Sequence, residues 1–276
     1  MQSGGRPNGE DRIDAMKILF TSDLHIHPTT KDDVMNAVRG RVKSERPDVL
    51  VISGDVTDMP GENVFRMLGE FDVPVVFCLG NHEFAYRSVG NTMETMMLDA
   101  SLARAEGIGH VHCLDIEDSV DIGGVRFYGN VLWYDGSLSN RMDASKYMAH
   151  VWENWLDASI QGFDPMREHN ACVESIVAVE RMTENMPKVL VTHTVPHRRL
   201  NKFDVLTPMS IANCYSGVDD LFDRRQVYPD YALCGHTHQR ALYEHRCANG
   251  HIVKCINSGN DYFWNTHEVV FDVVEM

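Results

Sequence analysis

The chain has 276 residues, of which 43% are hydrophobic and 24% charged, a balance typical of a globular protein and unlike disordered, collagenous or coiled-coil sequences. A formal net charge of −15 disfavours a protein that coats nucleic acid or an anionic membrane. No apolar run approaches the ~18 residues of a membrane span, and residues 1–15 lack the apolar segment of a secretory signal. We expect a disordered extension over residues 1–15 and one domain over residues 16–276.

The cysteines bear on the compartment in which the protein works. There are seven of them, an odd number, and no C-x-x-C pair occurs. Several lie inside apolar runs, where a thiol packs as a small hydrophobic side chain. This pattern predicts reduced thiols and a cytoplasmic protein.

In the first half of the chain, apolar β-branched runs alternate with segments of helical periodicity. The alternation predicts a parallel sheet covered by helices. Strands are expected over Lys17–Thr21, Val49–Ser53 and Pro74–Leu79, and helices over Lys31–Glu45, Glu62–Phe71 and Thr92–Glu106.

The sequence pattern changes in the second half of the chain. A more antiparallel stretch is followed by a segment rich in Met, Trp and Tyr, about 133–186, which we expect to be a helical insertion with helices over Ser145–Ile160 and Glu168–Asn185. Together the two halves predict an α/β core of two sheets. The further strands are expected over His110–Leu114, Ser119–Ile122, Val125–Tyr128, Lys188–Thr192, Tyr231–Cys234, Ala241–Cys247, Ile252–Asn257 and Val269–Val274.

Polar clusters follow five of the expected strands directly. Because open α/β sheets carry their sites at the carboxyl ends of strands, we expect these clusters to converge on one rim. Mixed carboxylate, amide and imidazole ligands suit Mn, Fe, Zn or Ni, and seven such groups suit two ions. The clusters are Asp23-Leu24-His25, Gly54-Asp55-Val56-Thr57-Asp58, Gly80-Asn81-His82-Glu83, Thr192-His193-Thr194 and Gly235-His236-Thr237-His238.

In this order the five clusters resemble the signature of the calcineurin-like metallophosphoesterase superfamily: D-x-H, G-D-x-x-D, G-N-H-E/D, a lone His and G-H-x-H. The resemblance extends from Met16 to about Asn260. It implies a four-layer αββα sandwich of two mixed sheets, with the site at the strand ends. It also implies a hydrolase of phosphoric esters with a dinuclear metal centre.

The resemblance further implies a role for each position. His82 would act as a general acid or as a hydrogen-bond donor to the phosphoryl oxygens, and Asp58 would orient it. A hydroxide bridging the two ions would attack phosphorus in line. Asp23, His25 and His238 would hold one ion, Asn81, His193 and His236 the other, and Asp55 would bridge both.

Two departures narrow the activity. The phosphoprotein-phosphatase branch carries arginines where this chain has Met59-Pro60 and Leu79, which disfavours a Ser/Thr protein phosphatase. We therefore expect a phosphodiesterase, with manganese as the favoured metal and a phosphate-ester small molecule or nucleotide as partner. The alternatives are a phosphomonoesterase acting on a small metabolite or a phosphoprotein, a nuclease, which the acidic charge disfavours, and a non-catalytic scaffold.

For several other residues the sequence allows two interpretations. His27 would complete the D-x-H-x-H motif of another hydrolase class, which the other four clusters do not fit. His197 could support His193 or be a loop histidine. The remaining alternatives are zinc binding or ordinary strand pairing for His245, Cys247, His251 and Cys255, a pocket wall or core packing for Trp133, Tyr134, Tyr147, Trp152 and Trp155, and a second phosphate site or a solvated loop for Arg198, Arg199 and Lys202.

Overall fold

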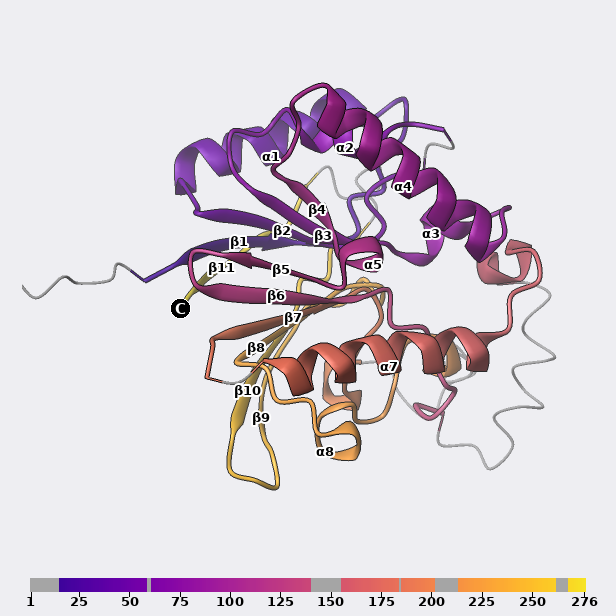
Figure 1. The fold of residues 1–276 in the computed structure, drawn as a ribbon, viewed down its shortest axis with the longest axis vertical. Helices are drawn as coiled ribbons and strands as arrows, with labels where there is room; N and C mark the ends of the chain where they lie inside the picture. Colours follow the sequence, from indigo (N-terminus) through magenta and orange to yellow (C-terminus); the bar gives the residue numbers. More distant parts are fainter. Residues whose placement is uncertain (1–14, 59–60, 140–154, 184, 202–212, 262–267) are drawn as a thin grey trace, which may run out of the picture.

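Two β-sheets pack face to face, with helices on both outer sides (Figure 1). The computed structural model describes residues 15–58, 61–139, 155–183, 185–201, 213–261 and 268–276. The first sheet has the order β11-β1-β2-β3-β4, formed by Asp272–Glu275, Lys17–Thr21, Val49–Ser53, Val75–Cys78 and Val111–Cys113. The second has the order β5-β6-β7-β8-β10-β9, formed by Ser119–Ile122, Val125–Asn130, Lys188–Thr192, Tyr231–Cys234, Ile252–Asn257 and Ala241–Arg246.

Both sheets are mixed. In the first sheet β1 to β4 run parallel, and β11 pairs antiparallel with β1 at the edge. In the second sheet β6, β7, β8 and β10 run parallel, and the hairpin strands β5 and β9 pair antiparallel at the two edges. The carboxyl ends of the parallel strands therefore lie at one rim of each sheet.

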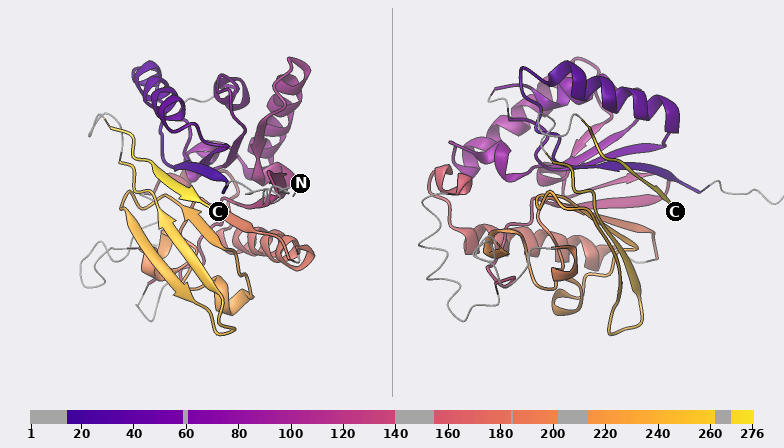
Figure 2. Two further views of the ribbon diagram at one scale, coloured as in Figure 1. Left: turned by 90° about the vertical axis from the view of Figure 1, so that its left-hand side faces the viewer. Right: turned by 180° about the vertical axis from the view of Figure 1, so that it is seen from behind.

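The helices form the outer layers, as the side and rear views show (Figure 2). α1, α2 and α4 cover the first sheet, whereas α7 and α8 lie against the second. Short elements complete the rim. The helices span Lys31–Glu45 (α1), Val64–Leu68 (α2), Asn81–Phe84 (α3), Val89–Ala105 (α4), Leu114–Glu117 (α5), Pro165–Met182 (α7) and Phe222–Arg225 (α8), with 3₁₀ turns at Leu156–Ser159 (η1) and Arg198–Leu200 (η2).

Side-chain alternation along the buried strands builds three apolar layers. In β1, Ile18 and Phe20 point between the sheets, where they pack with Val189 and Val191 of β7. Leu19 points the other way, into the layer under the helices of the first sheet. Since both faces of such strands are covered, they read as continuous apolar runs rather than alternating ones. The four-layer αββα sandwich implied by the sequence is confirmed.

Helix α7 belongs to the layered core. It connects the parallel neighbours β6 and β7, and Val173, Ile176 and Val179 pack in the core under the second sheet. This part of the segment expected as an insertion is therefore the crossover helix that a parallel pair requires. Of the helix expected over Ser145–Ile160, residues 145–154 lie outside the described residues, and the part that is described forms the single turn η1.

One half-buried carboxylate, that of Asp115, joins the two sheets near the rim. Asp115 Oδ2 accepts the amide hydrogen of Leu79, just beyond β3, at 2.6 Å, and Asp115 Oδ1 accepts that of Val131, just beyond β6, at 2.9 Å. Its desolvation raises the pKa of Asp115 to about 6. The contact fixes the spacing of the two strand ends.

Within the described part of the chain, no helix has both the length and the apolar character needed to span a membrane.

Candidate metal centre

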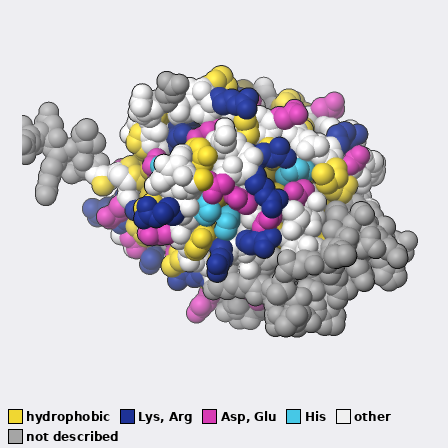
Figure 3. All heavy atoms as spheres, turned by 90° about the horizontal axis from the view of Figure 1, so that it is seen from below, with side chains coloured by type: hydrophobic (Ala, Val, Ile, Leu, Met, Phe, Trp, Pro, Cys, Tyr) yellow, Lys and Arg dark blue, Asp and Glu magenta, His cyan; other side chains and the backbone are white. Residues whose placement is uncertain are grey.

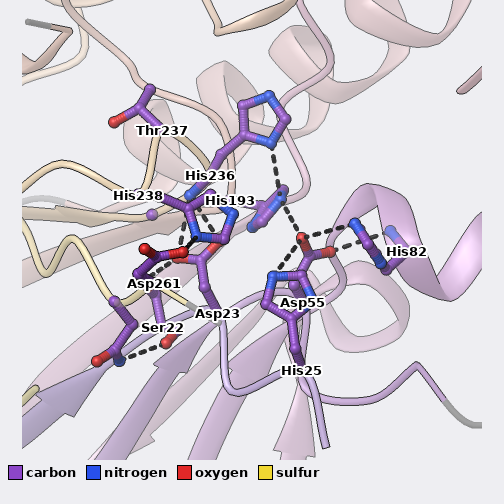
Figure 4. Close-up of polar contacts among 12 residues, drawn as sticks. Ser22, Asp23, His25, Asp55, His82, His193, His236, Thr237, His238 and Asp261 are labelled. Atoms are coloured by element: carbon purple, nitrogen blue, oxygen red, sulfur yellow. Dashed lines mark hydrogen bonds and ion pairs between the residues drawn. The ribbon is translucent and has the colours of Figure 1, made fainter. Parts of the chain in front are cut away.

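All five polar clusters meet at one rim. Asp23 and His25 follow β1, Asp55 follows β2 and Asn81 follows β3, all in the first sheet. His193 follows β7, and His236 and His238 follow β8, in the second sheet. The residues come from neighbouring strands, and the close-up shows the side chains of Asp23, His25, Asp55, His193, His236 and His238 gathered together (Figure 4).

Three ligand-type side chains surround one ring nitrogen of a fourth, His193. His193 Nε2 lies 3.3 Å from Asp55 Oδ2, 3.0 Å from Asn81 Oδ1 and 3.1 Å from His236 Nδ1. The outer nitrogens are fixed: His193 Nδ1 faces the carbonyl oxygen of Ser53 at 3.0 Å, and His236 Nε2 faces that of Tyr215 at 2.8 Å. Each ring therefore donates outward and turns its other nitrogen inward, as in protein metal sites.

A second group lies beside the first. Asp23, His25 and His238 bring one possible ligand atom each to within 4.8 Å of one another. Asp23 Oδ1 lies 4.0 Å from His238 Nε2, and the rings of His25 and His238 stack with their centroids 5.2 Å apart. Asp55 lies between the groups, since its Oδ2 is 3.6 Å from His25 Nε2 on this side. The donors present suit two borderline divalent ions.

Asp55 and the histidines around it shift one another's pKa values. Despite burial, which opposes both changes, Asp55 raises the pKa of His193 to about 10, and His193 and His82 hold the pKa of Asp55 well below its usual range. Burial and the neighbouring His193 together lower the pKa of His236 to about 3. One proton on His193 thus faces three acceptors, where a metal ion would replace it.

The backbone at the site takes an uncommon conformation. Five of the seven candidate ligands have left-handed φ angles: Asp23 (50°), His25 (42°), Asp55 (48°), His236 (69°) and His238 (51°). Asp, Asn and His tolerate this region better than most side chains. Each turn aims its side chain back over the strand end and into the space between the sheets.

Glycines allow the clusters to approach one another. A Cβ atom on Gly80 would lie 2.1 Å from Asp55 Oδ1, and one on Gly54 would lie 2.3 Å from His193 Nδ1. A Cβ atom on Gly235 would lie 2.2 Å from Asp23 Oδ2. Larger residues at these positions would force the ligand side chains apart.

His82 stands beside the seven candidate ligands, here called the ligand cluster, and faces solvent on one side. Its Nδ1 lies 2.7 Å from Asp58 Oδ1, an oxygen that His25 Nδ1 also approaches at 3.1 Å. Its backbone amide donates to Asp55 Oδ1 at 3.0 Å. Burial opposes the change, yet Asp55 and Asp58 raise the pKa of His82 to about 9. The ring is therefore held as a proton donor whose Nε2 points away from Asp58.

Asp157 contacts the ligand cluster without belonging to any motif. It lies in η1, fully buried, where Oδ1 accepts a hydrogen bond from Asn81 Nδ2 at 2.8 Å and Oδ2 accepts one from the hydroxyl of Tyr134 at 2.8 Å. An ionised carboxylate only accepts hydrogen bonds. It therefore turns the amide nitrogen of Asn81 toward itself and leaves the oxygen facing His193.

Two more groups hold the loops in place. Glu83 Oε2 accepts from the amide of Gly80 at 2.7 Å, and Oε1 accepts from the amide of Thr57 at 3.0 Å, which ties the second and third clusters together. Ser22 Oγ donates to Asp23 Oδ2, and Asn260 Nδ2 donates to the carbonyl oxygen of Ser22 at 2.6 Å. Neither contact was predicted from the sequence, in which Glu83 appeared only as the last residue of its cluster.

Two hollows open beside His82. A cavity of about 460 Å³ lies over the ligand cluster, and its wall includes Trp155, whose ring stacks on Tyr215 with centroids 4.9 Å apart. A smaller cavity of about 170 Å³ is lined by Asp58, Arg87 and others. Leu156 and His82 line both. A substrate bound over the cluster thus has room on both sides of His82.

The structure also places the other residues left open by the sequence. His27 is exposed and lies outside every ligand-type group found among the described residues, and Arg198 pairs with Asp219. His197 contacts His245 and not His193. Tyr147, Trp152 and Lys202 lie outside the described residues.

Comparison with known proteins agrees with this geometry. A family model for calcineurin-like phosphoesterases matches residues 16–240. An uncharacterized metallophosphoesterase of Aquifex aeolicus (strain VF5) is 27% identical over 139 residues, which are 48% of this chain and 53% of that protein. The match thus spans about half the length of this curated relative.

Solved structures share the fold. Phosphopantetheinyl hydrolase (PptH) from Mycobacterium tuberculosis aligns with a TM-score of 0.68 at 16% identity, covering 95% of this chain and 96% of that one. A dimetal phosphatase from Danio rerio gives a TM-score of 0.52 at 13% identity, covering 95% and 93%. At these identities the likeness shows the fold alone. Because the family model covers most of the sequence, the chain belongs to the calcineurin-like phosphoesterase family, whose members hydrolyse phosphate esters.

Proposed function

We propose that the protein is a phosphodiesterase that works with two divalent metal ions, manganese first among them. The observation that carries the proposal is the position of Asp55. Its Oδ2 lies 3.3 Å from His193 Nε2 on one side and 3.6 Å from His25 Nε2 on the other. A carboxylate shared between two such groups suits a pair of ions about 3.5–4 Å apart.

The proposed ligands divide into two sets around that carboxylate. Bound ions would polarise the phosphoryl oxygens and lower the pKa of water at the site. Asp157 fixes the amide of Asn81. The carbonyl oxygens of Ser53 and Tyr215 fix the rings of His193 and His236. The first set is Asp23, His25 and His238, the second is Asn81, His193 and His236, and Asp55 belongs to both.

His82 and Asp58 are the proposed catalytic pair. Asp58 holds Nδ1 of His82 at 2.7 Å, whereas Nε2 lies 3.9 Å from Asp55 Oδ2, and the residue lines the cavity over the cluster. A protonated ring there donates a hydrogen bond to a phosphoryl oxygen, or a proton to the departing alkoxide. In the metal-free protein Asp55 and Asp58 raise the pKa of His82 to about 9, and the contact with Asp58 would still favour the protonated ring once ions share the charge of Asp55.

The charge of the cavity wall supports a diester rather than a monoester. None of the described residues that line the larger cavity is Lys or Arg. A monoester carries close to two negative charges at neutral pH and gains more from such cations than a diester does. The phosphomonoesterase and nuclease readings remain the alternatives, and the free state of all seven cysteines supports a reducing compartment such as the cytoplasm.

Parallel assays of a diester and a monoester test the proposal. Metal-stripped and manganese-loaded protein is given bis(p-nitrophenyl) phosphate and p-nitrophenyl phosphate, together with a phosphopantetheinyl ester, because a protein of the same fold bears that name. We expect manganese-dependent turnover that favours the diester. His82→Ala is expected to lower kcat by about 10²–10⁴-fold, and Asp55→Asn to abolish turnover through lost metal binding.

His112→Ala is the matched control, since this histidine pairs with Glu117 at 2.9 Å in the first sheet, away from the clusters. It is expected to retain wild-type activity. A higher kcat/KM for the monoester would replace the diesterase proposal with the phosphatase alternative. Turnover that survives in Asp55→Asn would contradict the shared-carboxylate site.

A further inference from the structure

A second concentration of metal-binding side chains lies apart from the rim. His197 precedes η2, Asp220 precedes α8, and His245 stands near the end of β9. These three bring one ligand-type atom each to within 4.8 Å of one another. Asp223 and Cys247 form an overlapping group that also includes His245. None of these residues belongs to the five motifs.

The sequence had suggested a different set. His245, Cys247, His251 and Cys255 are close along the chain, but His251 Nε2 faces the carbonyl oxygen of Pro229 at 2.9 Å and Cys255 bonds to the carbonyl of Val253. The fold replaces them with His197 and Asp220, which lie 48 and 25 positions before His245 in the chain. Only the tertiary structure brings this second set together.

The orientation of His245 is the decisive feature. Its Nε2 lies 3.1 Å from Asp223 Oδ2, so the ring donates its proton there. The other nitrogen, Nδ1, is buried and has no hydrogen-bond partner among the residues that the structure describes, and the residue as a whole is only 9% exposed. A buried polar atom without a partner costs about 1–3 kcal/mol. A carboxylate that fixes one ring nitrogen while the other keeps its lone pair is the arrangement of metal-bound histidines.

The surroundings hold the other histidine rigidly. His197 is 7% exposed and lies between the rings of Phe222 and Tyr243, with centroids at 5.8 and 5.4 Å. Its centroid is 4.7 Å from that of His245. His197 Nδ1 accepts the amide hydrogen of Arg199 at 3.2 Å. A coordinate bond at that atom would exchange one long hydrogen bond, which is a small cost beside the energy of metal binding.

We propose that His197, Asp220 and His245 bind a zinc ion, with Asp223 orienting His245. Two imidazoles and one carboxylate are zinc's usual nitrogen and oxygen ligands, and water completes the tetrahedron. The site lies on the side of the molecule that carries α8 and β9. Seen from that side, histidine side chains reach the surface among interspersed acidic and basic ones (Figure 3). The ion would tie the segment after β7 to α8 and β9.

Metal content measures this directly, without an activity assay. Full-length protein is stripped, dialysed against micromolar zinc and analysed by inductively coupled plasma mass spectrometry, beside His245→Ala and His251→Ala. We expect His245→Ala to hold one zinc ion fewer per chain than the wild type, and His251→Ala, on the same hairpin, to hold as many. This difference stands whether or not the catalytic centre binds metal, so it is independent of the proposed function.

Two further measurements secure the assignment. Asp220→Asn, a milder change, is expected to lose the same ion while its circular dichroism stays that of the wild type, which guards against a variant that fails to fold. Cobalt-substituted protein is expected to lack a thiolate charge-transfer band from Cys247. Equal zinc content in the wild type, His245→Ala and Asp220→Asn would overturn the proposal. A thiolate band that Cys247→Ser removes would also overturn it, because the ion would then belong to the group of Asp223, His245 and Cys247.

Discussion

Asp157 connects a segment with no recognisable motif to the proposed metal ligands. Its two oxygens accept hydrogen bonds from Asn81 and Tyr134, and the side chain is fully buried. Nothing in the sequence around it distinguishes it from a turn-forming aspartate. Its role depends on a contact between residues 76 positions apart, which no local pattern encodes.

Replacing Asp157 should weaken metal binding. In Asp157→Ala the amide of Asn81 loses the acceptor that fixes its orientation, so its oxygen no longer faces the cluster in every molecule. We expect the affinity for one of the two ions to fall about 10–100-fold, measured by competition with a chelator. Asp157→Asn retains one acceptor and is expected to lose less.

Asp121→Asn is the control, because this carboxylate is paired with Arg126 on the surface, far from the ligands. It should bind both ions as the wild type does. If Asp157→Ala also binds both ions with unchanged affinity, Asp157 has no positioning role.

At the scale of the elements, the buried strands were predictable and the one-turn helices were not. The β1 and β2 strands match their expected ranges, because a covered parallel strand leaves an unmistakable apolar run. The helices α3, α5 and α8 have four residues each and were not expected. A single turn is too short to show a 3.6-residue period, and tertiary contacts decide whether it forms.

The carboxylate between the sheets gives a prediction about pH. Desolvation raises the pKa of Asp115 from 3.8 to about 6 in the folded protein. Between these values the folded chain binds the proton more tightly than the unfolded chain, so the contribution of Asp115 to stability grows as the pH falls through 6 and is lost as it rises. The free energy of unfolding of the wild type, relative to Asp115→Asn, should increase by about 1 kcal/mol from about pH 7 to about pH 5.

Urea unfolding of both proteins at the two pH values measures this difference. Asp115→Asn should also be less stable overall by about 1–3 kcal/mol, because an amide group then faces one of the two backbone N–H groups. The surface variant Asp121→Asn should show no such growth in acid. A difference that instead grows with rising pH would mean that the two N–H donors outweigh burial.

At the scale of the whole molecule, the family and the rim were within reach of the sequence, whereas the surroundings of the site were not. Motifs after strands sufficed to expect that Asp23, His25, Asp55 and the others meet. The partners that orient them, such as Asp157 and Asn260, come from elsewhere in the chain. The packing of α7 against the second sheet was not predicted either, because the composition of residues 133–186 suggested an insertion.

Metal removal should lower stability without unfolding the protein. The three apolar layers do not depend on the ions, whereas the proposed ligands on five strand ends assemble only in the folded chain. Manganese at about 100 times its Kd should stabilise the fold by about 2.7 kcal/mol per ion, or roughly 5–10 °C in Tm for a chain of this size. Differential scanning calorimetry with and without manganese measures the shift.

Asp55→Asn is the informative comparison here. Its Tm should respond much less to manganese, because the carboxylate common to both sets is gone. A Tm of the wild type that does not change with manganese would mean that the seven side chains do not bind it.

The left-handed turns at Asp23, His25, Asp55, His236 and His238 matter for anyone who wishes to transplant this centre into another scaffold. Each such turn costs an ordinary residue about 1–2 kcal/mol, and the host must supply that energy from its own packing. Copying the seven side chains onto regular strand ends would point them along the sheet and away from one another. The unit to be copied is the set of loops, with the glycines that let them touch, so that a graft succeeds or fails on backbone shape before any ligand chemistry is involved.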